Sequence, residues 1–256
     1  MNTAEPKPTF VLVHGAWHWA GCFQKVATLI AQAGHPVILP DLKAHGFSDF
    51  GCADVADMAD YVAPLVDLLR AAKQPVILLG HSMGGAALSY VAERHPEKVR
   101  QLFYLTAFMT PNGKTPNDYI FSNEYGADPA AAEIFQLLSA SADGKGIMLD
   151  VTKSELVKAA FYADCSARDV AIAGANIIAN TPVAPYVEPS AITSANFGRI
   201  PRVYIECTAD HAIPIAQQRK MQEDVPGAKV LTLHSSHSPF FSQPEALAEM
   251  VLSAVV

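Results

Sequence analysis

The stretch VILLGHSMGGAAL at residues 76–88 constrains the fold more than any other part of the chain. It begins as a short aliphatic run typical of a buried strand, and from Ala86 onward it favours a helix. The chain must therefore turn sharply at residues 80–84, GHSMG, which fit the G-x-S-x-G pattern of a nucleophile elbow. The glycines remove Cβ atoms where strand and helix crowd together, so the turn exposes the Ser82 hydroxyl.

Other short aliphatic runs without polar alternation indicate a mostly parallel sheet. Such runs are typical of strands covered on both faces. They are found at residues 9–15, 36–40, 75–80, 99–107, 201–208 and 228–233. Helical patterns at 22–33 and 54–72, a helix ending near residue 95 and a closing helix from about residue 244 separate or follow them. This alternation predicts an α/β fold with helices flanking the sheet.

Residues 110–197 break the alternation. The interval is rich in Ala, Asn, Pro and Gly, offers helical candidates at 130–139 and 154–162, and has no convincing aliphatic strand. A structureless loop of this length would be unusual in a compact domain. We therefore expect a helical cap, inserted after the fourth core strand and lying over the carboxyl edge of the sheet. The core would then comprise residues 1–109 and 198–256.

Composition and charge argue against several classes of function. The formal charge of −7, without a Lys/Arg-rich run, gives no electrostatic footprint for nucleic acid or anionic lipid. No apolar run approaches the ~20 residues that span a bilayer, and residues 1–10 resemble no secretory signal. We expect a cytoplasmic protein that binds a small-molecule partner. The sequence is compatible with either a monomer or a homodimer. The four cysteines lack metal-site or disulfide spacing and are interpreted as reduced thiols.

Ser82 needs a base and an acid, because a serine hydroxyl is a poor nucleophile at neutral pH. Asp210 follows the strand at 201–208, where a loop would deliver its carboxylate to the edge that carries Ser82. Glu206 is the rival acid, but it precedes the end of that strand. His237 is favoured as the base over His234, which directly abuts the last strand and so has the shorter reach.

A tetrahedral oxyanion would need preorganised donors. The backbone N–H of Met83, at the start of the helix, is one candidate, and that of Ala16, in the loop after the first strand, is the other. Gly15 would let that loop approach. His14 and His81 flank these turns and are assigned only an orienting role.

Several side chains are candidates for the substrate pocket. Trp17, His18 and Trp19 lie beside the expected oxyanion hole and would favour apolar or aromatic substrates, although core packing explains them equally well. The remaining candidates are Gly15, His81, Phe108, Tyr119, Phe161, Tyr162, Tyr186 and Ser238.

The segments FVLVHGAWHW, GHPVILPDLKAHGFSD, GHSMGG, YIECTADHAIP and SHSPFF together resemble the α/β-hydrolase superfamily. Within it they are most similar to the plant methylesterase and hydroxynitrile lyase family and its bacterial carboxylesterase relatives, including pyrethroid-hydrolysing esterases. The resemblance covers residues 9–108 and 202–250. In the cap, only YADCSARD around Cys165 resembles a patch of the plant members.

This resemblance implies an α/β-hydrolase fold, a triad of Ser82, Asp210 and His237, and oxyanion donors on Ala16 and Met83. It also implies hydrolysis. Lyases of this family carry threonine where Gly15 stands and lysine directly after the catalytic histidine, where this chain has Ser238.

We therefore expect a serine carboxylesterase that hydrolyses small to medium apolar or aromatic esters through an acyl-enzyme, with no cofactor and no metal. A lactonase or carbon–carbon bond hydrolase would keep the same triad. The same fold could also serve a hydroxynitrile lyase or a non-catalytic ligand receptor.

Overall fold

The computed structural model describes residues 7–123 and 129–256. Its centre is a six-stranded sheet in the order β2-β1-β3-β4-β8-β9, and every pair of neighbouring strands is parallel. The inner strands are almost entirely buried, as expected for apolar runs covered on both faces. The predicted α/β architecture is thereby confirmed. The strands are β1 (Phe10–Val13), β2 (Val37–Ile38), β3 (Val76–Ser82), β4 (Val99–Ala107), β8 (Arg202–Cys207) and β9 (Ala228–Leu233).

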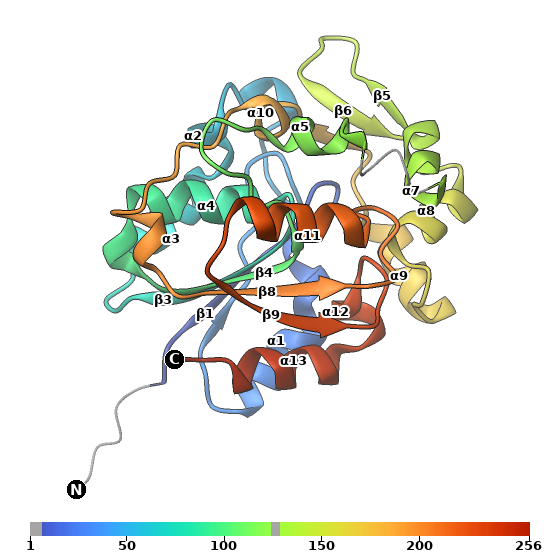
Figure 1. Ribbon diagram of the computed structural model, residues 1–256. Helices are drawn as coiled ribbons and strands as arrows, with labels where there is room; N and C mark the ends of the chain where they lie inside the picture. Colours follow the sequence, from blue (N-terminus) through green and yellow to red (C-terminus); the bar gives the residue numbers. More distant parts are fainter. Residues whose placement is uncertain (1–6, 124–128) are drawn as a thin grey trace, which may run out of the picture.

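Helices cover both faces of this sheet. Figure 1 shows α4 and α11 on one face and α1 and α13 on the opposite face. The helices of this core are α1 (Gln24–Gln32), α2 (Met58–Tyr61), α3 (Ala63–Ala71), α4 (Gly84–Arg94), α11 (Ile215–Asp224), α12 (Pro239–Ser242) and α13 (Pro244–Ser253). Short 3₁₀ turns lie at Ala20–Phe23, Cys52–Asp54, Pro96–Lys98 and Phe197–Arg199.

The single helix predicted at residues 54–72 is wrong in one respect, because the structure has two helices there. The first, α2, begins after Asp57, whose side chain caps it by accepting a hydrogen bond from the Asp60 N–H. The second, α3, begins at Ala63 with Pro64 in its first turn. Proline has no N–H to continue the preceding helix, so the chain restarts at Val62.

The prediction that the interval 110–197 has no strand is also wrong. The structure contains a three-stranded antiparallel sheet in the order β5-β6-β7. The helix predicted at 130–139 ends early, because Leu138 and Ser139 belong to β5. The elements here are α5 (Pro116–Ile120), α7 (Pro129–Ala132), a 3₁₀ helix (Glu133–Leu137), β5 (Leu138–Ala140), β6 (Gly146–Leu149), α8 (Ser154–Phe161), α9 (Ala167–Asn176), β7 (Asn180–Pro182) and α10 (Ala184–Val187).

These elements form the cap. Figure 1 shows α8 and α9 beyond the arrowheads of β8 and β9, which mark the carboxyl ends of the strands. Strand β7 has the sequence NTP, which intrinsic strand propensity disfavours. Pairing with β6 therefore decides its conformation. We propose that the cap comprises residues 110–197, which lie between β4 and β8.

We expect Gly85→Ala to destabilise the fold, because α4 packs closely on β4. A Cβ on Gly85 would lie 2.5 Å from Phe108 O and 2.8 Å from Ala107 Cβ. Such overpacking should lower the free energy of unfolding by roughly 1–3 kcal/mol in urea denaturation. Gly174→Ala is the control, since no atom lies within 4 Å of a Cβ there. That change in α9 should leave the stability unchanged or raise it by up to about 1 kcal/mol. Equal stability of the two variants would contradict this account of α4 packing.

Candidate active site

Ser82 occupies a strained turn at the carboxyl end of β3. Its φ is 53°, in the left-handed region that serine rarely adopts. A Cβ on Gly80 would lie 2.8 Å from Gly84 O, and a Cβ on Gly84 would lie 2.7 Å from His14 O. The glycines of the GHSMG turn are therefore needed for strand, helix and the loop after β1 to meet. Ser82 is left partly exposed at the wall of a pocket.

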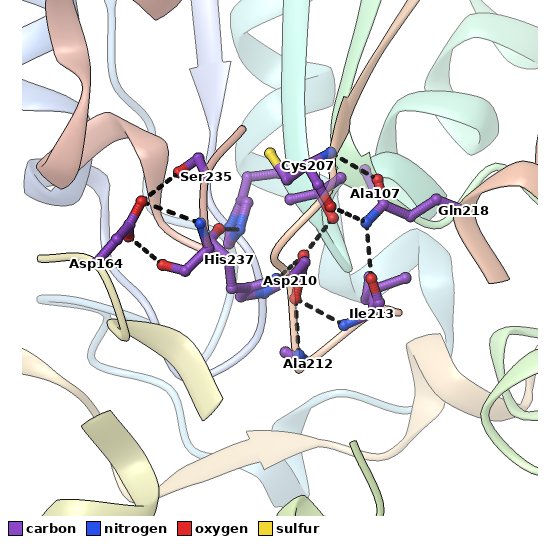
Figure 2. Close-up of polar contacts among 12 residues, drawn as sticks. Ala107, Asp164, Cys207, Asp210, Ala212, Ile213, Gln218, Ser235 and His237 are labelled. Carbon is purple, nitrogen blue, oxygen red and sulfur yellow. Dashed lines mark hydrogen bonds and ion pairs between the residues drawn. The ribbon is translucent and has the colours of Figure 1, made fainter. Parts of the chain in front are cut away.

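Asp210 and His237 form a buried pair. His237 Nδ1 lies 2.7 Å from Asp210 Oδ2, and both residues are nearly inaccessible to solvent. The other carboxylate oxygen accepts hydrogen bonds from the backbone N–H groups of Ala212 at 2.7 Å and Ile213 at 2.9 Å (Figure 2). The carboxylate is thus fixed on one side by its own loop and faces the imidazole on the other. A carboxylate oxygen in this place accepts the hydrogen bond of Nδ1–H, which leaves Nε2 as the ring nitrogen that can accept a proton.

Thr106 is a partner of Asp210 that the sequence did not reveal. Its hydroxyl donates a hydrogen bond to Asp210 Oδ2, the same oxygen that faces His237. In the pairing of β3 with β4, His81 is opposite Leu105 and Ser82 is opposite Ala107, so Thr106 is an unpaired extra residue. Its φ of 36° marks the same irregularity. A β-bulge re-aims side chains in this way, and nothing in the run VRQLFYLTA signals one.

The rival acid and the rival base lie elsewhere. Glu206 forms an ion pair with Arg219 at 2.9 Å and accepts a hydrogen bond from Thr232 at 3.0 Å. His234 is exposed and bonds through Nδ1 to the Thr208 hydroxyl at 2.9 Å. The structure brings neither of them to the pocket of Ser82.

Three further histidines, on β3 or in the loop after β1, are buried, neutral groups. His81 donates a hydrogen bond from Nε2 to the backbone oxygen of His237 at 2.8 Å. His14 donates from Nδ1 to Gly15 O at 2.8 Å, and His18 donates from Nδ1 to Ala16 O at 2.9 Å. Burial lowers the pKa of His14 and His81, and lowers the pKa of His18 to about 3. Each of the three bonds to a backbone oxygen and carries no charge at neutral pH.

Ser82 and His237 line one pocket together. The space between its atoms measures about 410 Å³, part of it open to solvent. Four of the predicted pocket residues are on its wall, namely Trp17, Phe108, Phe161 and Tyr186. Residues that the sequence did not identify complete it: Ile120, Ile134, Phe135, Leu138, Ala212 and Ile213. Ala212 and Ile213 come two and three residues after Asp210, a neighbourhood that could have indicated them, whereas the cap residues carry no distinguishing signal.

The other predicted pocket residues are not on this wall. Tyr119 donates its hydroxyl proton to Asp224 at 2.7 Å, and Tyr162 donates to His18 Nε2 at 2.9 Å. Trp19 packs against Phe241, with the ring centroids 6.2 Å apart. Ser238 is fully buried. Three more lie behind the pocket lining. His18 bonds to the Ala16 backbone, His81 bonds to the His237 backbone, and Gly15 packs against Ser82.

The loop after β1 approaches Ser82 closely. A Cβ on Gly15 would lie 2.7 Å from Ser82 Cβ, so only glycine fits without displacement. Within residues 7–123 and 129–256, neither the Ala16 nor the Met83 amide donates a hydrogen bond to another residue. Trp17 ties this loop to the cap, because its Nε1 donates to Ile147 O at 3.0 Å and its carbonyl accepts from Ile178 N at 2.9 Å.

The part of the chain that the structure describes offers neither a metal site nor a membrane span. No group of three or more His, Cys, Asp or Glu side chains among the described residues could hold a metal ion. Within the same ranges, no helix is both long and apolar enough to cross a membrane. The four cysteines are buried and unpaired with one another.

The sequence profile of the alpha/beta hydrolase family matches residues 10–250. The chain therefore belongs to the alpha/beta hydrolase family. A pyrethroid hydrolase of Sphingobium wenxiniae is 37% identical over 243 residues, which are 94% of this chain and 85% of that protein. Methylesterase 7 of Arabidopsis thaliana is 29% identical over 252 residues, 95% of this chain and 94% of the relative.

Solved structures show the same relationship as the sequences. A crystal structure of a pyrethroid hydrolase from Sphingobium faniae superposes with a TM-score of 0.86 at 33% identity and covers 96% of both chains. Within its family, the chain is thus related to pyrethroid hydrolases and plant methylesterases, as the resemblance of its motifs predicted.

The buried histidines predict acid sensitivity. Burial lowers the pKa of His18 to about 3 from 6.5 and also lowers those of His45 and His81. Below about pH 6.5 these histidines therefore bind protons in the unfolded chain but not in the folded chain. The free energy of unfolding falls as the pH falls. We expect urea denaturation to show a decreasing free energy of unfolding between about pH 7 and pH 5. In His18→Gln the slope should be shallower by up to about 1.4 kcal/mol per pH unit. An unchanged slope would contradict a neutral His18 in the native state.

Proposed function

We propose that this chain hydrolyses carboxylic esters of small to medium, apolar or aromatic groups through a triad of Ser82, His237 and Asp210. The observation that carries the proposal is the buried Asp210–His237 pair, whose imidazole shares one pocket wall with the strained Ser82. The chain is a carboxylic ester hydrolase by relationship, since its relatives include a pyrethroid hydrolase and methylesterases. The reaction would proceed in two steps of acyl transfer, in which Ser82, His237 and Asp210 each have a role.

In the first step the Ser82 hydroxyl attacks the ester carbonyl carbon while His237 Nε2 accepts its proton. The tetrahedral intermediate then collapses, and His237 returns the proton to the departing alcohol. In the second step water attacks the acyl-enzyme while His237 accepts a proton from it. The intermediate collapses, the bond between the acyl carbon and Ser82 Oγ breaks, and His237 returns the proton to Ser82 Oγ as the acid is released. Asp210 holds the imidazole in the required tautomer and stabilises the imidazolium that forms in each step.

The oxyanion would be held by the backbone N–H groups of Ala16 and Met83. Both amides lie next to Ser82, one through the close approach at Gly15 and the other at the start of α4. Neither has another acceptor among the residues described, so both are free to donate to an oxygen in the pocket. Donors fixed before the reaction stabilise the developing charge without reorganisation.

The pocket wall supports apolar or aromatic substrates. Apart from Ser82 and His237, its lining side chains are hydrophobic or aromatic, and none of them is Asp, Glu, Lys or Arg. Burying a charged substrate group against such a wall would be costly. A relative that is a pyrethroid hydrolase is consistent with apolar substrates. A cytoplasmic location and a lack of nucleic-acid or membrane partners stay predictions.

The competing functions make different demands on the site. Hydroxynitrile cleavage would need a positive charge next to the catalytic histidine, whereas the residue there is the fully buried, uncharged Ser238. A lactonase or carbon–carbon bond hydrolase would share the triad, so a panel of esters, lactones and mandelonitrile distinguishes them. A ligand receptor would bind members of that panel tightly with negligible turnover.

Ser82→Ala should lower kcat for an activated p-nitrophenyl ester by roughly 10⁴-fold or more, because covalent catalysis is lost while a small side chain still fits the turn. His237→Ala should be nearly as damaging. His234→Ala is the matched control and should stay within about twofold of wild type, since that ring bonds to Thr208 away from the pocket. More than about a tenth of wild-type activity in Ser82→Ala would exclude the serine mechanism. Cyanide release from mandelonitrile that requires Ser82 would favour the lyase.

The cap should set specificity through the residues on the pocket wall. Phe161→Leu should change the ratio of kcat/KM between an aromatic ester and an acetate ester by roughly tenfold, because it alters the space beside His237. Tyr119→Phe removes only a hydroxyl bonded to Asp224, and the ratio should hold within about twofold. Steady-state kinetics on both esters measures this. If both variants change the two esters by one common factor, Phe161 does not select the substrate.

A further inference from the structure

The loop that carries His237 has an unusually polar interior. Ser235 and Ser236 are each 1% exposed, although serine is more often found at the surface. A buried hydroxyl is costly unless it has a hydrogen-bond partner. The loop therefore depends on an acceptor outside itself for part of its structure.

Asp164 supplies that acceptor from the cap. It lies between α8 and α9, in the segment YADCSARD. Its Oδ2 accepts hydrogen bonds from Ser235 Oγ at 3.0 Å, Ser236 N at 3.1 Å and Ser242 Oγ at 3.1 Å. Its Oδ1 accepts one from Ser236 Oγ. Figure 2 shows Asp164 facing the loop of Ser235 and His237 from the side opposite Asp210.

This carboxylate remains ionised at neutral pH. Partial burial works against its charge, but the hydrogen bonds from Ser236, Ser235 and Ser242 outweigh burial and lower its pKa. An ionised carboxylate only accepts hydrogen bonds, and each of these partners can donate one. The residue as a whole is exposed and only its carboxylate is partly covered by the loop, so its contribution lies in the geometry that it imposes on the buried serines.

We propose that Asp164 is a positioning residue for the catalytic base, fixing the loop at residues 235–238 and through it the place of His237 relative to Ser82. The inference rests on the proposed function, in which His237 is that base. Two contacts hold His237 itself, through its Nδ1 to Asp210 and through its carbonyl to His81. Asp164 holds the two residues before it. Catalytic geometry tolerates little error, because a displacement of about 1 Å can cost roughly 100-fold in rate.

Asp164→Ala should therefore lower kcat by roughly 10- to 100-fold. KM should stay within about twofold, and the factor should be the same for every ester of the panel, because the pocket wall is unchanged. Asp164→Asn, which keeps the shape and one acceptor oxygen, should restore part of the rate. Asp150→Ala is the control, since among the described residues this half-buried cap carboxylate bonds only to its neighbours Thr152 and Lys153. It should leave kcat within about twofold of wild type.

A double-mutant cycle tests whether Asp164 acts through the loop. Ser236→Ala removes one of the hydroxyl contacts and should lower kcat by a smaller factor. Combined with Asp164→Ala, it should lower kcat by no more than about a further twofold, because the contact is already lost. If the loss of kcat in the double variant equals the product of the losses in the two single variants, Asp164 acts elsewhere and the proposal is overturned.

A spectroscopic measurement separates positioning from stability and from the proposed function. The His237 Nδ1–H bonded to Asp210 should give a far-downfield proton resonance, which should shift or broaden in Asp164→Ala and persist in Asp150→Ala. If the wild type turns over no ester, the proposed function fails, and this resonance still tests the positioning. Folded Asp164→Ala and Ser236→Ala variants with wild-type kcat and an unchanged resonance would overturn the inference. Should Asp164→Ala not fold, Asp164→Asn and Ser236→Ala decide by the same readouts.

Discussion

The left-handed backbone of Ser82 is the constraint on which the rest of the site depends. A serine at a φ of 53° persists only where the surrounding structure holds it there. Gly15, Gly80 and Gly84 let the loop after β1, the strand β3 and the helix α4 meet at this point, because a Cβ on any of them would collide with its neighbour. The proposed oxyanion donors, the amides of Ala16 and Met83, belong to the residues that directly follow Gly15 and Ser82 at this crowded point. The strain and the exposed nucleophile thus share one physical origin.

The parallel sheet explains why distant residues meet at that point. The carboxyl ends of parallel strands share one edge, so the loops after β1, β3, β8 and β9 all emerge beside Ser82. Asp210 follows β8 and His237 follows β9, and β4 lies between β3 and β8 in the sheet. The bulge at Thr106 uses this intermediate position, because it turns a β4 side chain toward Asp210. Every neighbour of the acid is therefore supplied by an adjacent strand or by its own loop.

Features set by local chemistry could be predicted from the sequence, and features set by packing could not. Aliphatic runs identified the core strands, and the GHSMG turn identified Ser82, because both depend on residues next to one another. The position of Asp210 and His237 after strands followed from topology. Thr106 depends on a register shift, and β7 depends on pairing that overrides the propensity of NTP. Which cap aromatics reach the pocket depends on rotation of short helices, so Tyr119 and Phe161 were indistinguishable before the structure.

In the proposed function the cap has two physical tasks that are separable in principle. Phe161 and Tyr186 line the pocket, where their size and shape would affect one substrate more than another. Trp17 contacts Ile147 and Ile178, and Asp164 contacts Ser235 and Ser236, so these contacts connect the cap to the loops that carry Ala16 and His237. Loosening such a connection moves groups that every substrate uses, so it scales all reactions alike. Helix α8 ends at Phe161, three residues before Asp164. The pocket-lining residue Phe161 and the loop-positioning residue Asp164 therefore lie in one short segment. A backbone shift in that segment would change selectivity and rate together, whereas a side-chain substitution would change one of them.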